Sequence, residues 1–420
     1  MSKTNVRVQD QHQSSITSEQ ITHTYQCLPL TTVKVVFMKN MLNTSHLNTL
    51  HIVADQNIAH LQDYFNLPIL GVPVKITGMA GREITADVLA KHQPDALLIR
   101  SVTKVDAKLL ANNDSVQFIG SATIGTDHVA TRYLAERGIG FVNAIGCSKH
   151  SVAQYVLTAI LTLRPQHWHQ PMTLGIIGMG NIGWTLAQYA TDLGWQVLAY
   201  DPFVSVVDKQ AARIKMARIK QVDLPKLLTN CDAISLHVPL TNDSQSPYPT
   251  HFLIDANALA ITPVDTLLIN TARGQVVNEA DLLADMIKTK RQVVLDVFEH
   301  EPVVSVDLLK RLHIATPHIA GYTLEGKLRG TQMIYDGLVE HFGLNRRQDM
   351  VNLLPNNPYH WQHLKQHPNQ LPAYYDIMAD NQALHAKITK HINHVIGTDF
   401  DALRKNYPLR REWCSTISEI

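Results

Sequence analysis

The chain has 420 residues, with 37 Lys and Arg against 36 Asp and Glu, and a formal net charge of +1 at pH 7. This length allows two or three domains with hydrophobic cores of their own. The balanced charge, without a basic stripe, excludes nucleic acid and membrane surfaces as default partners. No apolar run reaches the length of a membrane span. The 4 cysteines are widely spaced with no C-x-x-C pair, which favours reduced thiols and a cytoplasmic location.

Residues 1–49 are polar and rich in Gln, Ser and Thr. Such a composition offers too little apolar surface to form a core, so we expect a disordered or non-native N-terminal extension. One candidate strand lies within it, at residues 32–38. Met38 or Met41 is a candidate for the true start of the protein.

The next part of the chain alternates strand-like and helix-like segments. Short apolar runs predict strands at residues 50–54, 96–100, 116–120 and 140–144, and helical spacing predicts helices at residues 58–65 and 106–111. This alternation is typical of an α/β unit built on a parallel sheet.

A second α/β unit is predicted for residues 147–321, after a domain boundary near Gly146. An uninterrupted apolar helix at residues 152–163 leads into it. Strands are expected at residues 174–177, 196–200, 233–238, 266–270 and 292–296, and helices at residues 184–193, 224–229 and 280–288. In open α/β sheets, ligands bind at the carboxyl ends of the strands.

A long helix is predicted for residues 323–344, after which the composition changes to Asn, Pro, His and Gln. We interpret residues 351–420 as a third, small module. Within it, His360, His363 and His367 fall near one face of a helix, and three imidazoles can bind zinc. With 22 histidines in the chain this spacing is weak evidence, and we predict no metal site.

A glycine-rich segment connects the first strand and helix of the second unit. It reads Leu174-Gly-Ile-Ile-Gly-Met-Gly-Asn-Ile-Gly183. Gly178 permits a tight turn, Gly180 lets the backbone approach a pyrophosphate, and Gly183 lets the helix pack closely on the strand. The N–H groups at the helix start can hold phosphates. Asp201 follows about 20 residues later, where an acid suits the ribose hydroxyls of NAD and repels the extra phosphate of NADP.

Ionisable residues follow several strands on the side where a nicotinamide would lie. Arg273 can grip a carboxylate with its planar fork and polarise the neighbouring C–O group. His318 can take a hydroxyl proton while a hydride leaves, and Glu301 can orient its imidazole and stabilise the charged form. Asp296 can accept a hydrogen bond from the nicotinamide carboxamide. These residues suit hydride transfer at a carbon that bears a hydroxyl next to a carboxylate.

Each of these residues has an ordinary structural alternative. Arg273 could form a surface salt bridge, Asp296 could cap a helix, and His318 after Pro317 could close a turn. The glycine segment could be a turn without a ligand. The order of the motifs after a dinucleotide fingerprint favours the functional interpretation.

Three motifs resemble the D-isomer-specific 2-hydroxyacid dehydrogenases: N-x-x-R-G at residues 270–274, D-V-F-E-x-E-P at residues 296–302 and H-I-A-G at residues 318–321. Four further segments resemble one branch of that family, which acts on a phosphorylated four-carbon acid. They lie at residues 100–105, 120–129, 318–327 and 403–413.

The resemblance implies NAD-dependent oxidation of 4-phospho-D-erythronate to (R)-3-hydroxy-2-oxo-4-phosphobutanoate, a step of pyridoxal 5'-phosphate biosynthesis. It implies Arg273 and Glu301 as active-site residues and His318 as the proton acceptor. Substrate would contact Ser101, Thr123 and Tyr322. The residues expected on NAD are Gly178, Gly180, Asn181, Ile182, Gly183, Asp201, Val238, Asp296 and Gly321.

The resemblance also implies a fold: two Rossmann-like parallel-sheet domains around a cleft, plus a small C-terminal α+β dimerisation module. The substrate-binding domain would comprise residues 50–146 and about 322–350, the NAD-binding domain residues 147–321, and the dimerisation module residues 351–420. We therefore expect a homodimer. Because the chain ends soon after Trp413, whereas the family usually continues, this module could be truncated.

Two cofactor positions depart from the family pattern. Trp184 stands where many relatives carry an Arg, so a salt bridge to the pyrophosphate could be lost, or the indole could pack there instead. Val238 stands where relatives often place a hydroxyl, which leaves any contact with NAD to the backbone.

Several cations are candidates for the substrate phosphate. Arg100 and Lys104 flank one substrate-side loop, and Lys327 and Arg329 open the last long helix. A further hypothesis is that basic residues of the tail bind the substrate phosphate in a partner subunit; these are Arg404, Arg410 and Arg411.

Two rival functions remain open. The chain could be another dehydrogenase of the family, acting on 3-phosphoglycerate or on an unphosphorylated 2-hydroxy acid. It could also be an NAD-binding regulator with the same fold. Retention of Arg273, Glu301 and His318 favours turnover over regulation.

Overall fold

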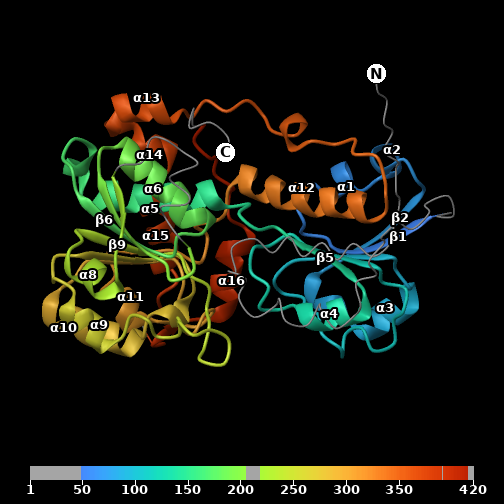
Figure 1. Ribbon diagram of the computed structural model, residues 1–420, viewed down its shortest axis with the longest axis horizontal. Helices are drawn as coiled ribbons and strands as arrows, with labels where there is room; N and C mark the ends of the chain where they lie inside the picture. The colour runs from blue at the N-terminus through green and yellow to red at the C-terminus, as the bar shows by residue number, and fades with distance from the viewer. Residues whose placement is uncertain (1–48, 205–217, 390, 415–420) are drawn as a thin grey trace, which may run out of the picture. The chain divides into compact units, whose positions relative to one another are not determined.

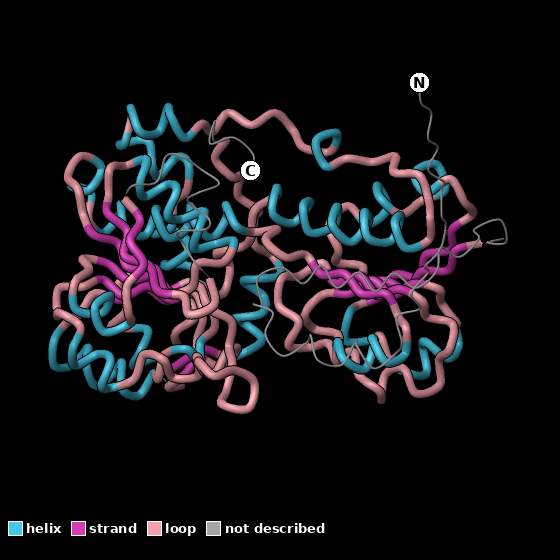
Figure 2. The backbone as a smooth tube through the Cα atoms, viewed as in Figure 1, coloured by secondary structure: helices cyan, strands magenta, loops and turns pink. Residues whose placement is uncertain are grey.

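The computed structural model describes residues 49–204, 218–389 and 391–414. In these ranges the strands form a five-stranded parallel sheet, a seven-stranded parallel sheet and a two-stranded antiparallel ribbon. Figure 2 shows the strands of the two larger sheets as separate groups, each flanked by helices. The predicted α/β fold with two Rossmann-like sheets is confirmed. The candidate strand at residues 32–38 and the N-terminal extension lie outside the described residues, apart from Thr49.

The five-stranded sheet has the order β2-β1-β3-β4-β5. Its strands are β1 (Leu50–Asp55), β2 (Val74–Met79), β3 (Ala96–Ile99), β4 (Phe118–Ser121) and β5 (Gly140–Asn143). The helices within this stretch are α1 (Leu61–Tyr64), α2 (Leu67–Leu70), α3 (Ala86–His92) and α4 (Thr131–Arg137).

One face of this sheet is covered by α12 (Leu324–His341), a helix from much later in the chain (Figure 1). Its apolar residues Leu328, Ile334 and Leu338 share a core with strands β1, β3 and β4. Gly337 permits the close approach, because a Cβ there would lie 2.6 Å from the Val142 side chain. The chain therefore returns to its first sheet after completing the second.

The seven-stranded sheet has the order β13-β11-β10-β9-β6-β7-β8. Its strands are β6 (Thr173–Ile177), β7 (Gln196–Tyr200), β8 (Ile219–Gln221), β9 (Ala233–Leu236), β10 (Leu267–Asn270), β11 (Val293–Leu295) and β13 (Ile314–Ala315). The helices of this part are α5 (Lys149–Leu163), α6 (Asn181–Asp192), α8 (Leu224–Thr229), α9 (Ala256–Ile261), α10 (Glu279–Thr289) and α11 (Val306–Leu309). The strands are apolar because helices bury them on both faces.

The C-terminal segment packs into the core of the seven-stranded part (Figure 1). Its elements are α13 (Trp361–Gln366), α14 (Leu371–Tyr374), α15 (Ile377–His385), β14 (His394–Val395) and α16 (Gly397–Lys405), with β14 pairing to β12 (Val304–Ser305). The rings of Trp361 and Trp413 stack at 5.5 Å, and Tyr189 of α6 meets Trp361 edge-on at 5.2 Å. The dimerisation role of this segment stays a prediction.

Three expected helices are wrong or too long. Residues 106–111 form turns and no helix, although the Asp106 carboxylate accepts the backbone N–H groups of Lys108 and Leu109 as a helix N-cap does. A segment of about six residues gains few helical hydrogen bonds for the cost of nucleating a helix. The helix expected at residues 58–65 is a single turn, since His60 takes a left-handed conformation (φ 53°) before it. The expected helix at residues 323–344 ends at His341, just before Gly343, whose φ is +63°. No helix among the described residues is long and apolar enough to cross a membrane.

Candidate active site

The glycine turn joins β6 to α6 at the carboxyl end of the seven-stranded sheet. Gly178 has φ +97°, and a Cβ there would lie 2.5 Å from the carbonyl oxygen of His237. A Cβ on Gly183 would lie 2.0 Å from the carbonyl oxygen of Gly178, so the helix packs on the strand as predicted. A Cβ on Gly180 would meet no atom within 4 Å among the described residues, which leaves open space where a pyrophosphate would approach.

Asp201 directly follows β7 and is tied to this turn. Its carboxylate accepts the backbone N–H of Met179 at 2.8 Å and that of Phe203 at 2.9 Å. The side chain is half-buried, so the remaining lone pairs of its oxygens are available to ribose hydroxyls. Asn181 and Ile182 begin α6, where the first N–H groups of a helix have no partner within the helix and can bind phosphate. These residues therefore fit NAD.

The structure shows where the two side chains that depart from the family pattern lie. Trp184 is buried in the core that α5 shares with α6, so its indole packs inside and cannot mimic an arginine beside the pyrophosphate. Val238 follows β9, is half-buried and packs against the neighbouring apolar cluster.

Arg273 follows β10 in a turn that Asn270 builds. The Asn270 side chain donates to the carbonyl oxygen of Arg273 at 2.9 Å and accepts the N–H of Ala272 at 3.0 Å. The Arg273 guanidinium donates to Ala272 O at 2.8 Å and lies 3.3 Å from the Asp127 carboxylate. Its side chain is 37% exposed, so the planar fork is accessible to a carboxylate substrate.

Glu301 and His318 form the paired acid and base that the motifs predict. The Nδ1 of His318 lies 2.7 Å from Glu301 Oε1. Burial acts to raise the pKa of Glu301, but the neighbouring His318 and Arg404 outweigh it and lower that pKa overall. The carboxylate is therefore charged at neutral pH, and it leaves Nε2 of the imidazole for a substrate.

Asp296 is completely buried beneath this pair and shapes the His318 turn. Its carboxylate accepts the Thr316 hydroxyl at 2.6 Å and the backbone N–H groups of Ile319 and Ala320 at 2.8 and 3.0 Å. Burial raises its pKa, although these hydrogen bonds and His318 act in the opposite direction. His318 itself has φ 55°, a conformation that these contacts hold in place. The sequence pattern missed this supporting role.

The residues expected on substrate come from separate loops. Ser101 follows β3 and is exposed. Thr123 follows β4, and its hydroxyl lies 2.9 Å from the hydroxyl of Ser121, the last residue of that strand. Tyr322 follows the His318 turn, and Arg404 of α16 donates to its hydroxyl at 3.5 Å. Gly321, next to it, faces the Ser148 side chain.

The tail arginines have partners within this chain. The Arg410 guanidinium donates to the backbone carbonyls of Ser151, Ile319, Ala320 and Tyr322. Arg411 donates to the Glu325 carboxylate at 2.6 Å. Both arginines are thus engaged within their own chain, and a role at the phosphate of a partner subunit stays a prediction. Arg410 supports the turn that carries His318, a role that no local pattern reveals.

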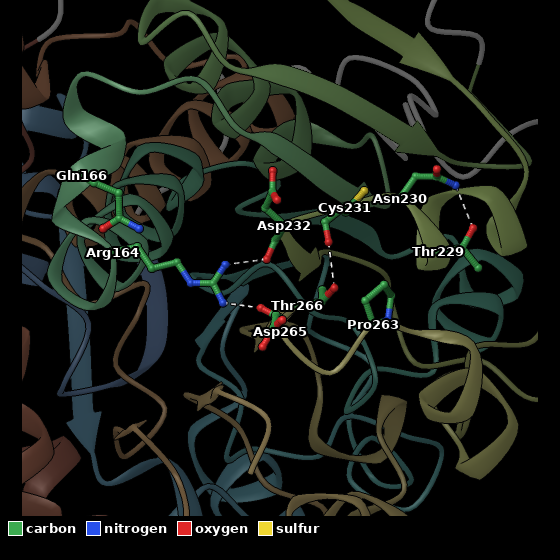
Figure 3. A pocket seen from close by; sticks show the side chains of 9 residues that line it. All are labelled: Arg164, Gln166, Thr229, Asn230, Cys231, Asp232, Pro263, Asp265 and Thr266. Atoms are coloured by element: carbon green, nitrogen blue, oxygen red, sulfur yellow. Dashed lines mark hydrogen bonds between the residues drawn. The ribbon is translucent and has the colours of Figure 1, made fainter. Parts of the chain in front are cut away.

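A cavity of about 360 Å³ lies at the opposite end of the seven-stranded sheet (Figure 3). Asp232 and Thr266, which directly precede β9 and β10, help to line it. Arg164 crosses it and donates to the backbone carbonyls of Asp232 and Asp265. These bonds tie strand starts together, so the arginine is structural and the cavity is separate from the candidate active site.

Comparisons with known proteins agree with this geometry. Residues 161–320 match the family described as "D-isomer specific 2-hydroxyacid dehydrogenase, NAD binding domain". The chain is 58% identical over 380 residues to an erythronate-4-phosphate dehydrogenase of Psychrobacter sp. (strain PRwf-1), which covers 87% of this chain and 99% of that protein. It is 44% identical over 373 residues to a protein of the same name from Acinetobacter baumannii (strain ATCC 17978), with 87% and 98% covered.

A solved structure of NAD-bound 3-phosphoglycerate dehydrogenase from Entamoeba histolytica has the same fold. It superposes with a TM-score of 0.56 at 22% identity and covers 70% of this chain and 96% of that one. Identity at this level supports the fold alone, whereas 58% over a nearly complete relative identifies the family. The chain belongs to the D-isomer specific 2-hydroxyacid dehydrogenase family, among the proteins named erythronate-4-phosphate dehydrogenase, and residues 161–320 are its NAD-binding domain.

Proposed function

We propose that the protein oxidises 4-phospho-D-erythronate to (R)-3-hydroxy-2-oxo-4-phosphobutanoate with NAD, in pyridoxal 5'-phosphate biosynthesis. The observation that carries the proposal is the 2.7 Å contact between His318 and Glu301, in a chain whose relatives bear the name of this activity. When bound, NAD supplies the hydride acceptor.

His318 is the general base for the substrate hydroxyl. Because Glu301 accepts the hydrogen bond from Nδ1, Nε2 is the atom that takes the proton. The imidazole becomes positively charged as it does so, and the Glu301 carboxylate stabilises that charge.

Arg273 binds the substrate carboxylate and orients the carbon that loses the hydride. Its present partner Asp127 is 67% exposed and 3.3 Å away, so exchanging it for a substrate carboxylate costs little. Ser101, Thr123 and Tyr322 contact the rest of the substrate. Asp296 supports the His318 turn and contributes to the nicotinamide side of the site.

The proposal extends to a homodimer formed through residues 351–420 and to a cytoplasmic location. The C-terminal segment exposes apolar side chains at Val351 (72%), Leu409 (39%) and Ile396 (39%), and such side chains favour contact with another surface. Sedimentation of the purified protein tests the dimer, and a monomer at micromolar concentration would contradict it.

The decisive experiment follows NADH absorbance with purified protein, NAD and one of three acids: 4-phospho-D-erythronate, 3-phospho-D-glycerate or D-erythronate. We expect turnover selective for 4-phospho-D-erythronate, and we expect His318→Ala to reduce kcat at least about 100-fold, as for a lost general base. Preference for 3-phospho-D-glycerate would indicate the rival dehydrogenase. NADH binding without turnover of any acid would indicate the regulator.

A further inference from the structure

Three cations from distant parts of the chain gather around Tyr322. The Nζ of Lys327, in the first turn of α12, lies 3.6 Å from the centre of the Tyr322 ring. Arg404 of α16 reaches the Tyr322 hydroxyl at 3.5 Å. Arg100 directly follows β3, and its positive charge acts to lower the pKa of both Tyr322 and Lys327. We call Arg100, Lys327 and Arg404 the cation cluster.

Within the cation cluster, Lys327 is the residue that lacks a carboxylate partner among the described residues, whereas Asp55 pairs with Arg100 and the carboxylates of Asp401 and Glu301 raise the pKa of Arg404. Within the described residues, no carboxylate lies within salt-bridge distance of Lys327, and Arg100 is paired through its Nε with the buried Asp55 at 3.0 Å. Arg404 has a distant ion pair, 3.7 Å from Asp401. Burial lowers the pKa of Lys327, as do Arg100 and Arg404, while Tyr322 acts in the opposite direction. Arg100 and Arg404 therefore disfavour the charged form of Lys327, and an anion bound beside Lys327 would favour it.

Arg404 also carries an unused donor. Its Nε is buried and has no hydrogen-bond partner among the described residues. A buried donor without an acceptor destabilises the folded state, and a phosphate oxygen supplies the acceptor in charge-assisted form. The side chain as a whole remains 26% exposed, so a ligand has access to it.

The cation cluster adjoins the proton-transfer pair. Tyr322 belongs to the turn that carries His318, since its N–H donates to the carbonyl oxygen of Ile319 at 2.8 Å, and the charge of Arg404 acts to lower the pKa of Glu301. In a four-carbon acid with a 4-phosphate, the phosphorus lies roughly 5 Å from the reacting carbon, given carbon–carbon bonds of about 1.5 Å. The cation cluster therefore lies next to the turn that carries His318, where a phosphate so close to the reacting carbon is expected.

Other cations near the site are already engaged. Lys104 is 80% exposed and pairs with Asp106. Arg329 pairs with the buried carboxylate of Glu412 at 2.8 Å, and Arg410 and Arg411 have the partners described above.

We propose that Arg100, Lys327 and Arg404 form the subsite that binds the substrate phosphate, and that α16 of the same chain supplies Arg404. This inference rests on the proposed function, because it identifies which part of that site receives the phosphate. Arg404 thereby gives the C-terminal segment a direct part in substrate choice.

The test compares wild-type protein with Arg404→Ala, Arg404→Lys and the control Lys405→Ala, which removes an exposed charge from the same helix. We expect Arg404→Ala to raise KM for 4-phospho-D-erythronate roughly 10- to 100-fold, as for a lost charge-assisted hydrogen bond. KM for NAD should stay within about two-fold, Arg404→Lys should recover part of the loss, and Lys405→Ala should match wild type.

Calorimetric titration of the NADH complex with inorganic phosphate separates this proposal from the proposed function, because it needs no turnover. We expect Arg404→Ala to weaken phosphate binding by a similar factor. The proposal is overturned if wild type binds no phosphate, if Arg404→Ala binds it as wild type does, or if KM for NAD rises in parallel. Wild type that binds phosphate through Arg404 but turns over another phosphorylated acid would contradict the proposed function alone.

Discussion

His318 shows how much support a single catalytic side chain requires. Its left-handed backbone is held by the Asp296 carboxylate through Ile319 and Ala320, and by Arg410 through the carbonyls of the same turn. Glu301 then sets the ring through Nδ1. Three residues from two parts of the chain, Asp296 and Glu301 from one motif and Arg410 from the tail, therefore orient one imidazole, which is the pre-organisation that proton transfer needs.

Replacing Glu301 by Gln tests the charge of this pair apart from its geometry. The amide oxygen can still accept from Nδ1, but it no longer stabilises a positively charged imidazole. We expect kcat to fall roughly 10- to 100-fold with KM for NAD unchanged. Steady-state rates of Glu301→Gln, with the exposed Glu340→Gln as control, give the comparison. An unchanged kcat would show that the charge of Glu301 has no part in the reaction.

His150 couples the folded state to pH. Burial lowers its pKa from 6.5 to about 4, with Glu412 opposing and Arg329 adding to the shift. Between about pH 6.5 and pH 4, the imidazole of His150 is therefore protonated in the unfolded chain but mostly neutral in the folded chain. The free energy of unfolding consequently decreases as pH falls from 6.5 towards 4. The loss from this residue is on the order of 3 kcal/mol at pH 4.

Denaturant unfolding at several pH values checks this prediction. Compared with wild type, His150→Gln should lose less stability between pH 7 and pH 5, while the exposed His391→Gln should keep the wild-type slope. If the free energy of unfolding changed with pH in the same way in all three proteins, His150 would not be the source of the pH dependence. The sign is specific, because a histidine with a raised pKa would stabilise the protein at acid pH instead.

At the scale of elements, two glycines of the turn between β6 and α6 are expected to serve different purposes: Gly183 the fold, and Gly180 the binding of NAD. Gly183→Ala places a Cβ 2.0 Å from backbone, whereas Gly180→Ala places one in open space at φ −68°. We expect Gly183→Ala to lower the melting temperature by several degrees, since a backbone clash must be relieved. Gly180→Ala should melt like wild type but show a KM for NAD raised at least about 10-fold.

Thermal melting without cofactor, followed by NAD titration, distinguishes the two variants. Equal losses of melting temperature would mean that Gly180 serves the fold and not the pyrophosphate. The prediction follows from which neighbour each glycine faces, protein or open space, and that difference is invisible in the G-x-G-x-x-G pattern.

Elements with strong local signals were predicted well. The strand at residues 196–200 and the helix at residues 224–229 agree with β7 and α8 in both bounds. The short helix expected at residues 106–111 was wrong, because the turn that Asp106 caps does not continue as a helix. Strand β2 and helix α4 were missed because their apolar spacing is incomplete, and β2 lies at the edge of its sheet, where less of a strand is buried.

At the scale of the whole molecule, Glu412 and Trp413 near the end of the described chain belong to the core. Trp413 is 3% exposed and stacks on Trp361, and its backbone N–H donates to Gln154 of α5 at 3.0 Å. Glu412 accepts the Ser151 hydroxyl at 2.8 Å and pairs with Arg329. The tail therefore connects α5 with α12 and carries Arg410 to the active-site turn.

Trp413→Ala should destabilise the protein by roughly 3–5 kcal/mol, the usual cost of removing a large buried aromatic side chain. Leu409→Ala, at a side chain 39% exposed, is the matched control and should cost less than about 1 kcal/mol. Urea unfolding measures both. A Trp413→Ala protein as stable as wild type would mean that the tail contributes little to the core.

The sequence by itself determined the two α/β units, the dinucleotide turn and the order of Arg273, Glu301 and His318, because apolar periodicity, glycine conformations and short motifs are local properties. Only the tertiary structure decided which cations gather beside the active-site turn. Arg404 and Tyr322, separated by 82 positions, meet beside Lys327, while the equally basic Arg410 and Arg411 are occupied by backbone carbonyls and by Glu325. Whether a charge serves a substrate or the fold depends on which partners folding brings within hydrogen-bonding distance, and no local pattern contains that information.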